Sequence, residues 1–258
     1  MQSDFESDVK QYAAGNCQSM EAWFTKLEDA VERTSIAGIK DLLSEHEMKI
    51  EVASFQGGLF ADHSAARDTA WELFRKRLTL CRELSIRTVV VAFDILPPTT
   101  QKTVDLSREL LIQAAQHAAA NRIRLAVEPQ SSSAFGNNLQ TMAAMLAETN
   151  SPHLGVCLDL FHFFTGPSKY SDLRYLSNDN LFHVQLCDLA DVPREFATDS
   201  DRIVPGDGDF EVEPIMEFLR EIKYTGCVSV ELMNPQIWQV PPRQFSEIGM
   251  KAIERLLP

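Results

Sequence analysis

The sequence predicts an α/β fold, a (β/α)8 TIM barrel that lacks its first strand, and three observations lead to this prediction. Short apolar runs alternate with longer stretches of helical periodicity along all 258 residues, which is typical of parallel strands covered by helices. No glycine-rich phosphate loop follows the first strand-like run, and this favours a closed barrel over an open nucleotide-binding sheet. The chain begins with a helical pattern and contains seven strand-like runs, whereas a complete barrel has eight strands.

In the first half of the chain, the spacing of apolar residues predicts helices over residues 4–14, 27–47, 64–84 and 104–121. The runs between these helices are short and apolar, as buried strands are. The three runs are SMEAWF (19–24), KIEVASFQ (49–56) and RTVVVAF (87–93). Helix and strand therefore alternate from the start of the chain.

The second half repeats this rhythm. Its strand-like runs are RLAVE (124–128), LGVCLD (154–159), LFHVQL (181–186) and CVSVEL (227–232). Helical spacing predicts helices over 139–148, 214–223 and 244–257, and a shorter one over 170–176. Since no linker or low-complexity tract interrupts the pattern, we expect a single domain over residues 1–258.

Composition limits the partners that this protein can have. The 24 Lys and Arg residues face 37 Asp and Glu residues, which gives a net charge of −13. A surface of this charge repels nucleic acid and anionic lipid. No apolar run approaches the ~20 residues that cross a bilayer, and the polar start MQSDFESDVK is unlike a signal peptide. We therefore expect neither a nucleic-acid partner nor a membrane partner.

Cysteine usage indicates the compartment. The five cysteines are Cys17, Cys81, Cys157, Cys187 and Cys227. Their number is odd, no two form a CxxC pair, and three lie in apolar strand-like runs. Free thiols in a reducing cytoplasm are expected, rather than disulfides.

Polar side chains end the last four predicted strands. They are Glu128, Asp159, Gln185 and Glu231. Each has a small or polar neighbour two positions earlier, whereas the large residue directly before it belongs to the opposite face of the strand. Because the active sites of such barrels lie at the C-terminal ends of the strands, we expect these four side chains to meet near the barrel axis.

Carboxylates that converge in a buried pocket repel one another, so they take up protons or hold a cation. Hard oxygen donors favour Mg²⁺ or Mn²⁺, with Zn²⁺ and Co²⁺ as alternatives. The competing interpretation is that each carboxylate is a solvated strand end. A solvated strand end would explain any one of these carboxylates. It is a weaker explanation for all of them together, because they end successive strands.

Five motifs carry a resemblance to a known family. They are VEP (127–129), GVCLDLFH (155–162), HVQLCD (183–188), PGDGDF (205–210) and SVEL (229–232). In this order and spacing, the chain resembles the xylose-isomerase-like sugar phosphate isomerase/epimerase superfamily from about residue 5 to residue 257. The resemblance implies a β/α barrel in which Glu, Asp, His and Glu side chains hold one divalent metal.

Carried over to this sequence, the implied metal ligands are Glu128, Asp159, Gln185 and Glu231. Gln185 replaces the commoner His, and in this respect the chain looks like hydroxypyruvate isomerases and some dehydroshikimate dehydratase-like members. An amide oxygen in place of an imidazole nitrogen makes the site harder and less suited to Zn²⁺. The family's first strand would precede residue 5 and is not in this chain.

The resemblance implies an isomerase or epimerase of a small keto-sugar or sugar derivative. The metal would stabilise an enediolate, and Glu128 and Glu231 would carry the proton from opposite faces. The residues implied to contact or orient substrate are His162, His183, Arg194, Arg202 and Trp23, with the two arginines placed to receive a carboxylate or phosphate. Packing is the alternative role for His162, His183 and Trp23, and solvation is the alternative for the arginines.

Other functions are compatible with the same predicted fold. A metal-dependent 3-dehydroshikimate dehydratase would use the same proton abstraction and then expel water, and the substrate would be a keto-acid. A barrel that binds metal or a partner without catalysis is a second alternative. Apurinic endonuclease chemistry needs a His-rich multi-zinc site, which six histidines and a charge of −13 do not favour.

Two further expectations concern the shape of the site. The gap left by the missing strand would be plugged by N-terminal residues or by a neighbouring subunit, and because such barrels often pair, a homodimer is one candidate assembly. Phe60, Asp62 and His63 follow a glycine pair and are candidates for a lid.

Overall fold

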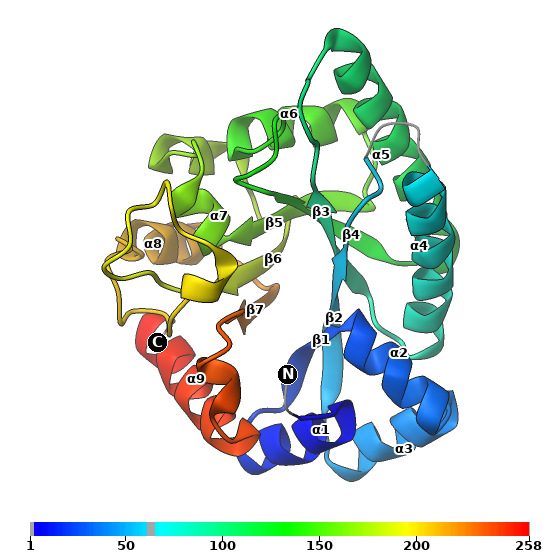
Figure 1. The fold of residues 1–258 in the computed structure, drawn as a ribbon, viewed down its shortest axis with the longest axis vertical. Coiled ribbons are helices and arrows are strands. Elements are labelled where there is room, and N and C mark those ends of the chain that lie inside the picture. Colours follow the sequence, from blue (N-terminus) through cyan, green and yellow to red (C-terminus); the bar gives the residue numbers. More distant parts are fainter. Residues whose placement is uncertain (1–2, 61–64, 258) are drawn as a thin grey trace.

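The computed structural model describes residues 3–60 and 65–257. Seven parallel strands form one sheet in the order β1 to β7, and the sheet curves into a nearly closed barrel with helices around it (Figure 1). The strands are β1 (Ser19–Trp23), β2 (Lys49–Gln56), β3 (Thr88–Phe93), β4 (Arg124–Pro129), β5 (Leu154–Asp159), β6 (Leu181–Leu186) and β7 (Cys227–Val230). The predicted barrel with seven visible strands is confirmed.

Helices precede, separate and follow the strands. They are α1 (Phe5–Ala14), α2 (Phe24–Arg33), α3 (Ile36–Glu45), α4 (Ala65–Glu83), α5 (Gln101–Asn121), α6 (Leu139–Thr149), α7 (Leu160–Thr165), α8 (Glu213–Glu221) and α9 (Pro242–Leu256). No helix in the described part of the chain is both long and apolar enough to cross a membrane.

The structure differs from the predicted helices at a helix break and at one added helix, and it refines a third. The helix expected over 27–47 is two helices, because the Ser35 hydroxyl accepts a hydrogen bond from the Gly38 N–H at 3.0 Å and so starts α3 anew. The short helix α7 was not anticipated, and the stretch expected to be helical over 170–176 is a 3₁₀ helix (Tyr170–Tyr175). Ser64, the expected first residue of the following helix, lies outside the described residues.

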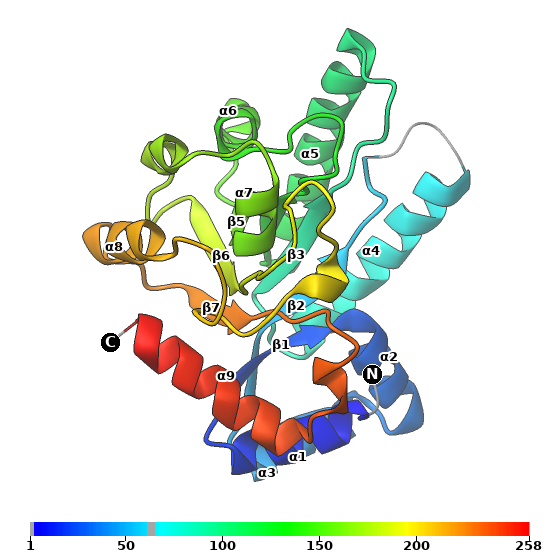
Figure 2. The same cartoon turned by 60° about the vertical axis from the view of Figure 1, so that its left-hand side comes forward.

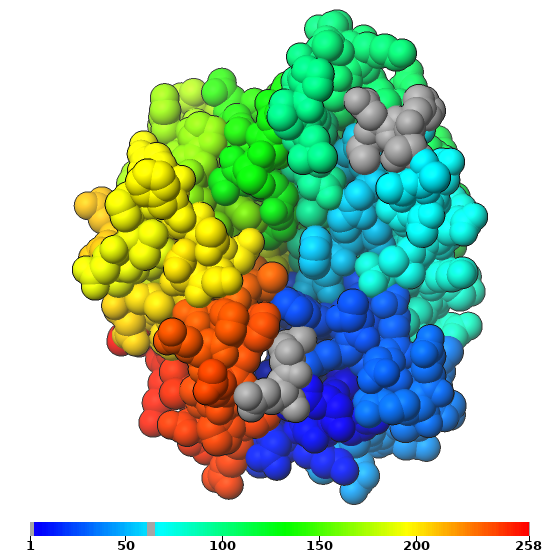
Figure 3. Space-filling view, in the orientation of Figure 1, coloured from blue at the N-terminus to red at the C-terminus, as the bar shows by residue number. Residues whose placement is uncertain are grey.

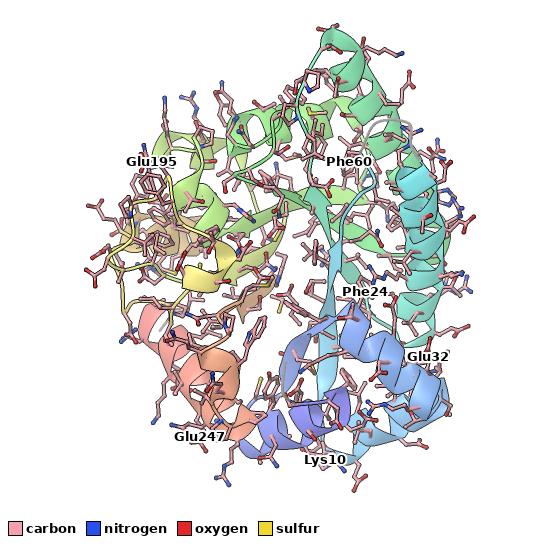
Figure 4. The ribbon with its side chains drawn as sticks, in the orientation of Figure 1. Lys10, Phe24, Glu32, Phe60, Glu195 and Glu247 are labelled. Atoms are coloured by element: carbon pink, nitrogen blue, oxygen red, sulfur yellow. The ribbon has the colours of Figure 1, made fainter. Side chains whose placement is uncertain are left out.

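Two apolar layers hold the sheet. Inward-facing side chains of the strands, among them Val52, Val90 and Cys157, form a small cluster inside the barrel. The large cluster between sheet and helices includes Val127 and Leu158, as the predicted alternation of faces requires. In Figure 4, Phe24 and Phe60 point inward, whereas Lys10, Glu32 and Glu195 point away from the helical ring. All five cysteines are free, as expected.

The barrel is open between β1 and β7, which form the two edges of the sheet. Outside this opening α1 and α9 lie side by side (Figure 2), and the rings of Tyr12 and Phe245 are 6.0 Å apart. A cavity of about 550 Å³ between the edge strands is lined by Met20, Ser229 and Ser246, among others. The N-terminal helix thus covers the gap from outside, while space remains between the strands.

Candidate metal and active site

The last strands bring acidic side chains together at their C-terminal ends. In the register of the sheet Glu128 lies beside Ala92, and Asp159 lies beside Gln185. One potential ligand atom each from Glu128, Asp159 and His162 lies within 4.8 Å of the others, and all three residues are buried. His162 reaches this position because it lies in the first turn of α7, where its N–H donates to the Asp159 carboxylate at 2.8 Å.

Arg202 links a third carboxylate to this group. Its Nη1 donates to Asp159 Oδ2 at 2.6 Å and to Glu231 Oε2 at 3.0 Å. The guanidinium lies 4.5 Å from the centre of the Phe161 ring and also contacts the Asp199 carboxylate at 2.7 Å. With only 2% of its surface exposed, Arg202 is held among protein carboxylates.

The three carboxyl groups differ in acidity because of their surroundings. Burial opposes ionisation of Asp159, but the Arg202 guanidinium, together with His162 and the hydrogen bonds to the carboxylate, outweighs it and lowers the pKa of Asp159 to about 2. Burial and then the Asp159 charge raise the pKa of Glu128 well above its ordinary value. Burial also raises the pKa of Glu231, against the effect of Arg202. Burial lowers the pKa of His162, so its ring is neutral and can act as a ligand.

These charges fit a divalent cation. Glu128, Asp159 and Glu231 carry three negative charges when ionised, and Arg202 supplies one positive charge, which leaves an excess of two within the buried cluster. Burial, and after it the neighbouring carboxylates, raises the pKa values of Glu128 and Glu231. Two protons or one divalent ion would balance it, and the donors are the carboxylate oxygens and imidazole nitrogen that such ions accept.

Gln185 belongs to a second buried group beside the carboxylates. Its amide Nε2 donates to Glu21 Oε1 at 2.9 Å, and its Oε1 accepts from the Cys157 thiol at 3.1 Å. Glu21 Oε2 lies 2.8 Å from His183 Nε2 and accepts from the Ser229 hydroxyl. His183 thus lies one inward step from Gln185, as expected, and its partner is Glu21.

Sequence reasoning missed Glu21 as a site residue. It gave this carboxylate no role, although an acidic residue inside a short apolar strand was a usable signal. Burial opposes ionisation of Glu21, but His183 lowers its pKa below the ordinary value. Burial likewise opposes protonation of His183, whereas Glu21 raises the pKa of His183 to about 10. The two side chains form a buried ion pair.

The other residues predicted to contact substrate lie in separate places. Arg194 is exposed on the loop after β6, with its nearest acidic partner Glu195 at 3.5 Å, so it stands apart from the carboxylates. Trp23 packs edge-on against Trp238 at 6.1 Å, and both line a cavity of about 130 Å³ that Glu231 also borders. The segments that carry Arg202 (yellow) and that follow β7 (orange) lie side by side on this face (Figure 3).

The expected lid is not supported by its described member. Phe60 is buried, and its ring lies 4.7 Å from that of Phe93, so it is part of the core. Asp62 and His63 lie outside the described residues.

Comparisons with known proteins identify the family of this chain. The model of the family described as xylose isomerase-like TIM barrel matches residues 9–256. An inosose isomerase from Bacillus velezensis is 23% identical over 245 residues, which cover 90% of this chain and 84% of the relative. An inosose isomerase from Halalkalibacterium halodurans is 38% identical over 88 residues, and this match spans only 34% of this chain and 31% of the relative.

A solved structure shares the fold. The crystal structure of IOLI protein with a binding zinc atom superimposes with a TM-score of 0.91 at 19% identity, over 99% of this chain and 93% of the other. This likeness extends to the seven parallel strands and the surrounding helices described above. The chain therefore belongs to the xylose isomerase-like TIM barrel family.

Proposed function

We propose that this protein is a divalent-metal-dependent isomerase or epimerase of a small keto-sugar or related cyclic polyol ketone, such as an inosose. The observation that carries the proposal is the buried excess of negative charge formed by Glu128, Asp159 and Glu231 around Arg202. The inosose isomerases among the relatives support the reaction class.

The proposed metal ligands are Glu128, Asp159, Gln185 and Glu231. His162 is a candidate fifth ligand, because one of its nitrogens lies within 4.8 Å of ligand atoms of Glu128 and Asp159. Mg²⁺ and Mn²⁺ suit the oxygen donors best, whereas the neutral His162 ring and the zinc of the IOLI structure favour Zn²⁺. When bound, such an ion would act as a Lewis acid on the substrate's carbonyl oxygen.

Glu128 and Glu231 are proposed to carry the proton. Gln130 holds Oε2 of Glu128 through its amide, and Arg202 holds Oε2 of Glu231, so both carboxylates are oriented. Their raised pKa values bring each carboxyl closer to the acidity that suits a group taking and returning a proton near neutral pH. In this scheme one carboxylate removes the proton beside the carbonyl and the other returns a proton from the opposite face.

Solvent exchange tests this function. The protein, loaded with Mn²⁺ or Zn²⁺, is incubated in D₂O with inosose and a panel of ketoses, and proton NMR follows deuterium entry at the carbon beside the carbonyl. Exchange is expected with at least one substrate, and Glu231→Gln should fold normally and lose activity by at least ~100-fold. Metal binding without any exchange would contradict the proposal and favour a non-catalytic barrel, and water loss from 3-dehydroshikimate would assign the site to a dehydratase instead.

We further propose a single domain over residues 1–258 in the cytoplasm. The barrel rhythm runs without a linker, and the five free thiols suit a reducing compartment. A small-molecule carbohydrate or keto-acid is the proposed partner, since the charge of −13 disfavours nucleic acid. A homodimer is the proposed assembly, which sedimentation equilibrium would test.

A further inference from the structure

A buried carboxylate on β1 holds the third proposed metal ligand. Glu21 Oε1 accepts a hydrogen bond from Gln185 Nε2 at 2.9 Å, across the opening of the barrel. Its other oxygen faces His183 Nε2 at 2.8 Å and accepts from the Ser229 hydroxyl. The side chain of Glu21 is 8% exposed and that of His183 is fully buried. Three strands are thus joined through one carboxylate.

The contacts of His183 fix the position of the Glu21 carboxylate. Its Nδ1 lies 3.1 Å from the Cys227 carbonyl oxygen, and its Nε2 lies 2.8 Å from Glu21 Oε2 and 3.1 Å from the Ser229 hydroxyl. The Gln185 Nε2 group donates to the other oxygen of this carboxylate, Glu21 Oε1. The NH₂ group of Gln185 therefore faces β1.

The amide oxygen of Gln185 then faces the opposite way. It lies 3.1 Å from the Cys157 thiol, which donates to it. Cys157 precedes Asp159 by two residues on β5, on the same inward face. The orientation that Glu21 imposes therefore directs an oxygen, and not an N–H group, toward the strand that carries Asp159.

We propose that Glu21 is a positioning residue that makes Gln185 an oxygen donor to the cation of the proposed site. This inference rests on the proposed function, because it concerns a ligand of that metal. Without Glu21, the Gln185 amide can rotate by half a turn and offer its NH₂ group, which cannot bind a cation. Partners that orient metal ligands in this way typically change metal affinity by ~10–100-fold when they are removed.

Calorimetric titration of the EDTA-treated full chain with MnCl₂ tests the proposal. Glu21→Gln is expected to weaken Mn²⁺ binding by ~10–100-fold. Ser229→Ala removes a hydrogen bond to the other oxygen of the same carboxylate and is the matched control, with an affinity close to wild type. Wild-type affinity in Glu21→Gln, or an equal loss in both variants, would overturn the proposal.

A double-mutant cycle separates positioning from the charge of Glu21. If Glu21 acts through Gln185, Glu21→Gln should weaken Mn²⁺ binding much less in a Gln185→Ala background than in the wild type. A charge effect would persist at full size in that background and would overturn the proposal.

If Glu21→Gln does not fold, nuclear magnetic resonance of the metal-free wild type tests the proposal instead. The side-chain NH₂ signals of Gln185, assigned by their loss in Gln185→Ala, should exchange with solvent much more slowly than those of the exposed Gln244. Equally fast exchange would refute the anchoring of Gln185 by Glu21. If the wild type binds no Mn²⁺, the proposed function fails, and the NMR result still decides whether Glu21 anchors Gln185.

Discussion

At the scale of single residues, Arg202 is the buried cation of the carboxylate cluster. It bridges Asp159 and Glu231 through one nitrogen. Removing one partner from a buried charge cluster typically costs ~3–5 kcal/mol. We therefore expect Arg202→Met to lower the free energy of unfolding by about that amount in EDTA, and by clearly less in saturating Mn²⁺.

Urea denaturation at pH 7 measures this difference. Arg194→Met is the control, since Arg194 is exposed and remote from the cluster, and it should change the free energy of unfolding by no more than ~0.5 kcal/mol. A loss in Arg202→Met that Mn²⁺ does not reduce would show that the cluster does not bind the metal.

The ion pair of His183 and Glu21 predicts a pH dependence. The pKa of His183 is raised to about 10 in the folded protein, where burial opposes protonation and Glu21 favours it, whereas an unfolded histidine titrates near ~6.5. The charged His183 therefore stabilises the folded protein fully at pH values below the pKa of the unfolded histidine. This stabilisation is lost as pH rises through the pKa of His183 in the folded protein. Between these two pH values the free energy of unfolding should fall by about 1.4 kcal/mol per pH unit from this group.

Glu128 and Glu231 contribute with the same sign, because their pKa values are also raised. The double variant Glu21→Gln/His183→Gln removes both charges of the pair and isolates its contribution. Urea midpoints measured from pH 6.5 to pH 9 should fall less steeply in the double variant than in the wild type. Parallel curves would mean that His183 is neutral in the folded state.

The sequence indicated some of these residues and missed others for physical reasons. Glu128 and Asp159 end apolar runs, so the geometry of parallel strands alone predicts that they meet. Glu21 lies inside a strand and acquires its role from side chains more than 160 positions away in the chain, His183 and Gln185. The interpretation of Arg202 as a receiver of substrate anions overlooked the carboxylates that surround it, because its loop has no periodicity from which its path could be predicted.

At the scale of elements, close contact between β5 and β6 requires a glycine. A Cβ atom on Gly155 would lie 2.5 Å from the Phe182 ring, well inside contact distance. Because overpacking of this kind typically costs ~1–3 kcal/mol, Gly155→Ala should lower the free energy of unfolding by that amount. Thermal and urea denaturation measure it.

Gly249 in α9 provides the opposite case. A Cβ atom there would meet Val230 at 3.8 Å, an ordinary contact, and alanine favours a helix over glycine by up to ~1 kcal/mol. Gly249→Ala should be neutral or stabilising. Equal losses in both variants would contradict the packing described for β5 and β6.

Strands were easier to predict than helix ends. Most of the predicted strands agree with the structure to within a residue or two, because a buried parallel strand must be apolar along its whole length. The break between α2 and α3 depends on a single capping serine, Ser35, and α7 has only six residues. Such features are too short to change the periodicity of a sequence.

At the scale of the whole molecule, a bound cation should stabilise the barrel, because its proposed ligands come from four neighbouring parts of the sheet. Glu128 lies on β4, Asp159 on β5, Gln185 on β6 and Glu231 directly after β7. An ion that binds only the folded state at 100 times its dissociation constant adds ~2.7 kcal/mol to the free energy of unfolding. Excess EDTA should therefore lower the melting temperature of the metal-loaded protein, and Mn²⁺ should restore it. A melting temperature that responds equally in Asp159→Asn would place the ion elsewhere.

Anomalous diffraction from crystals grown with Mn²⁺ tests the central claim, that one divalent cation binds among the strand-end carboxylates, most directly. The account predicts a single anomalous peak per chain in contact with Glu128, Asp159 and Glu231. A map with no peak there, and with Arg202 still bridging Asp159 and Glu231, would contradict it.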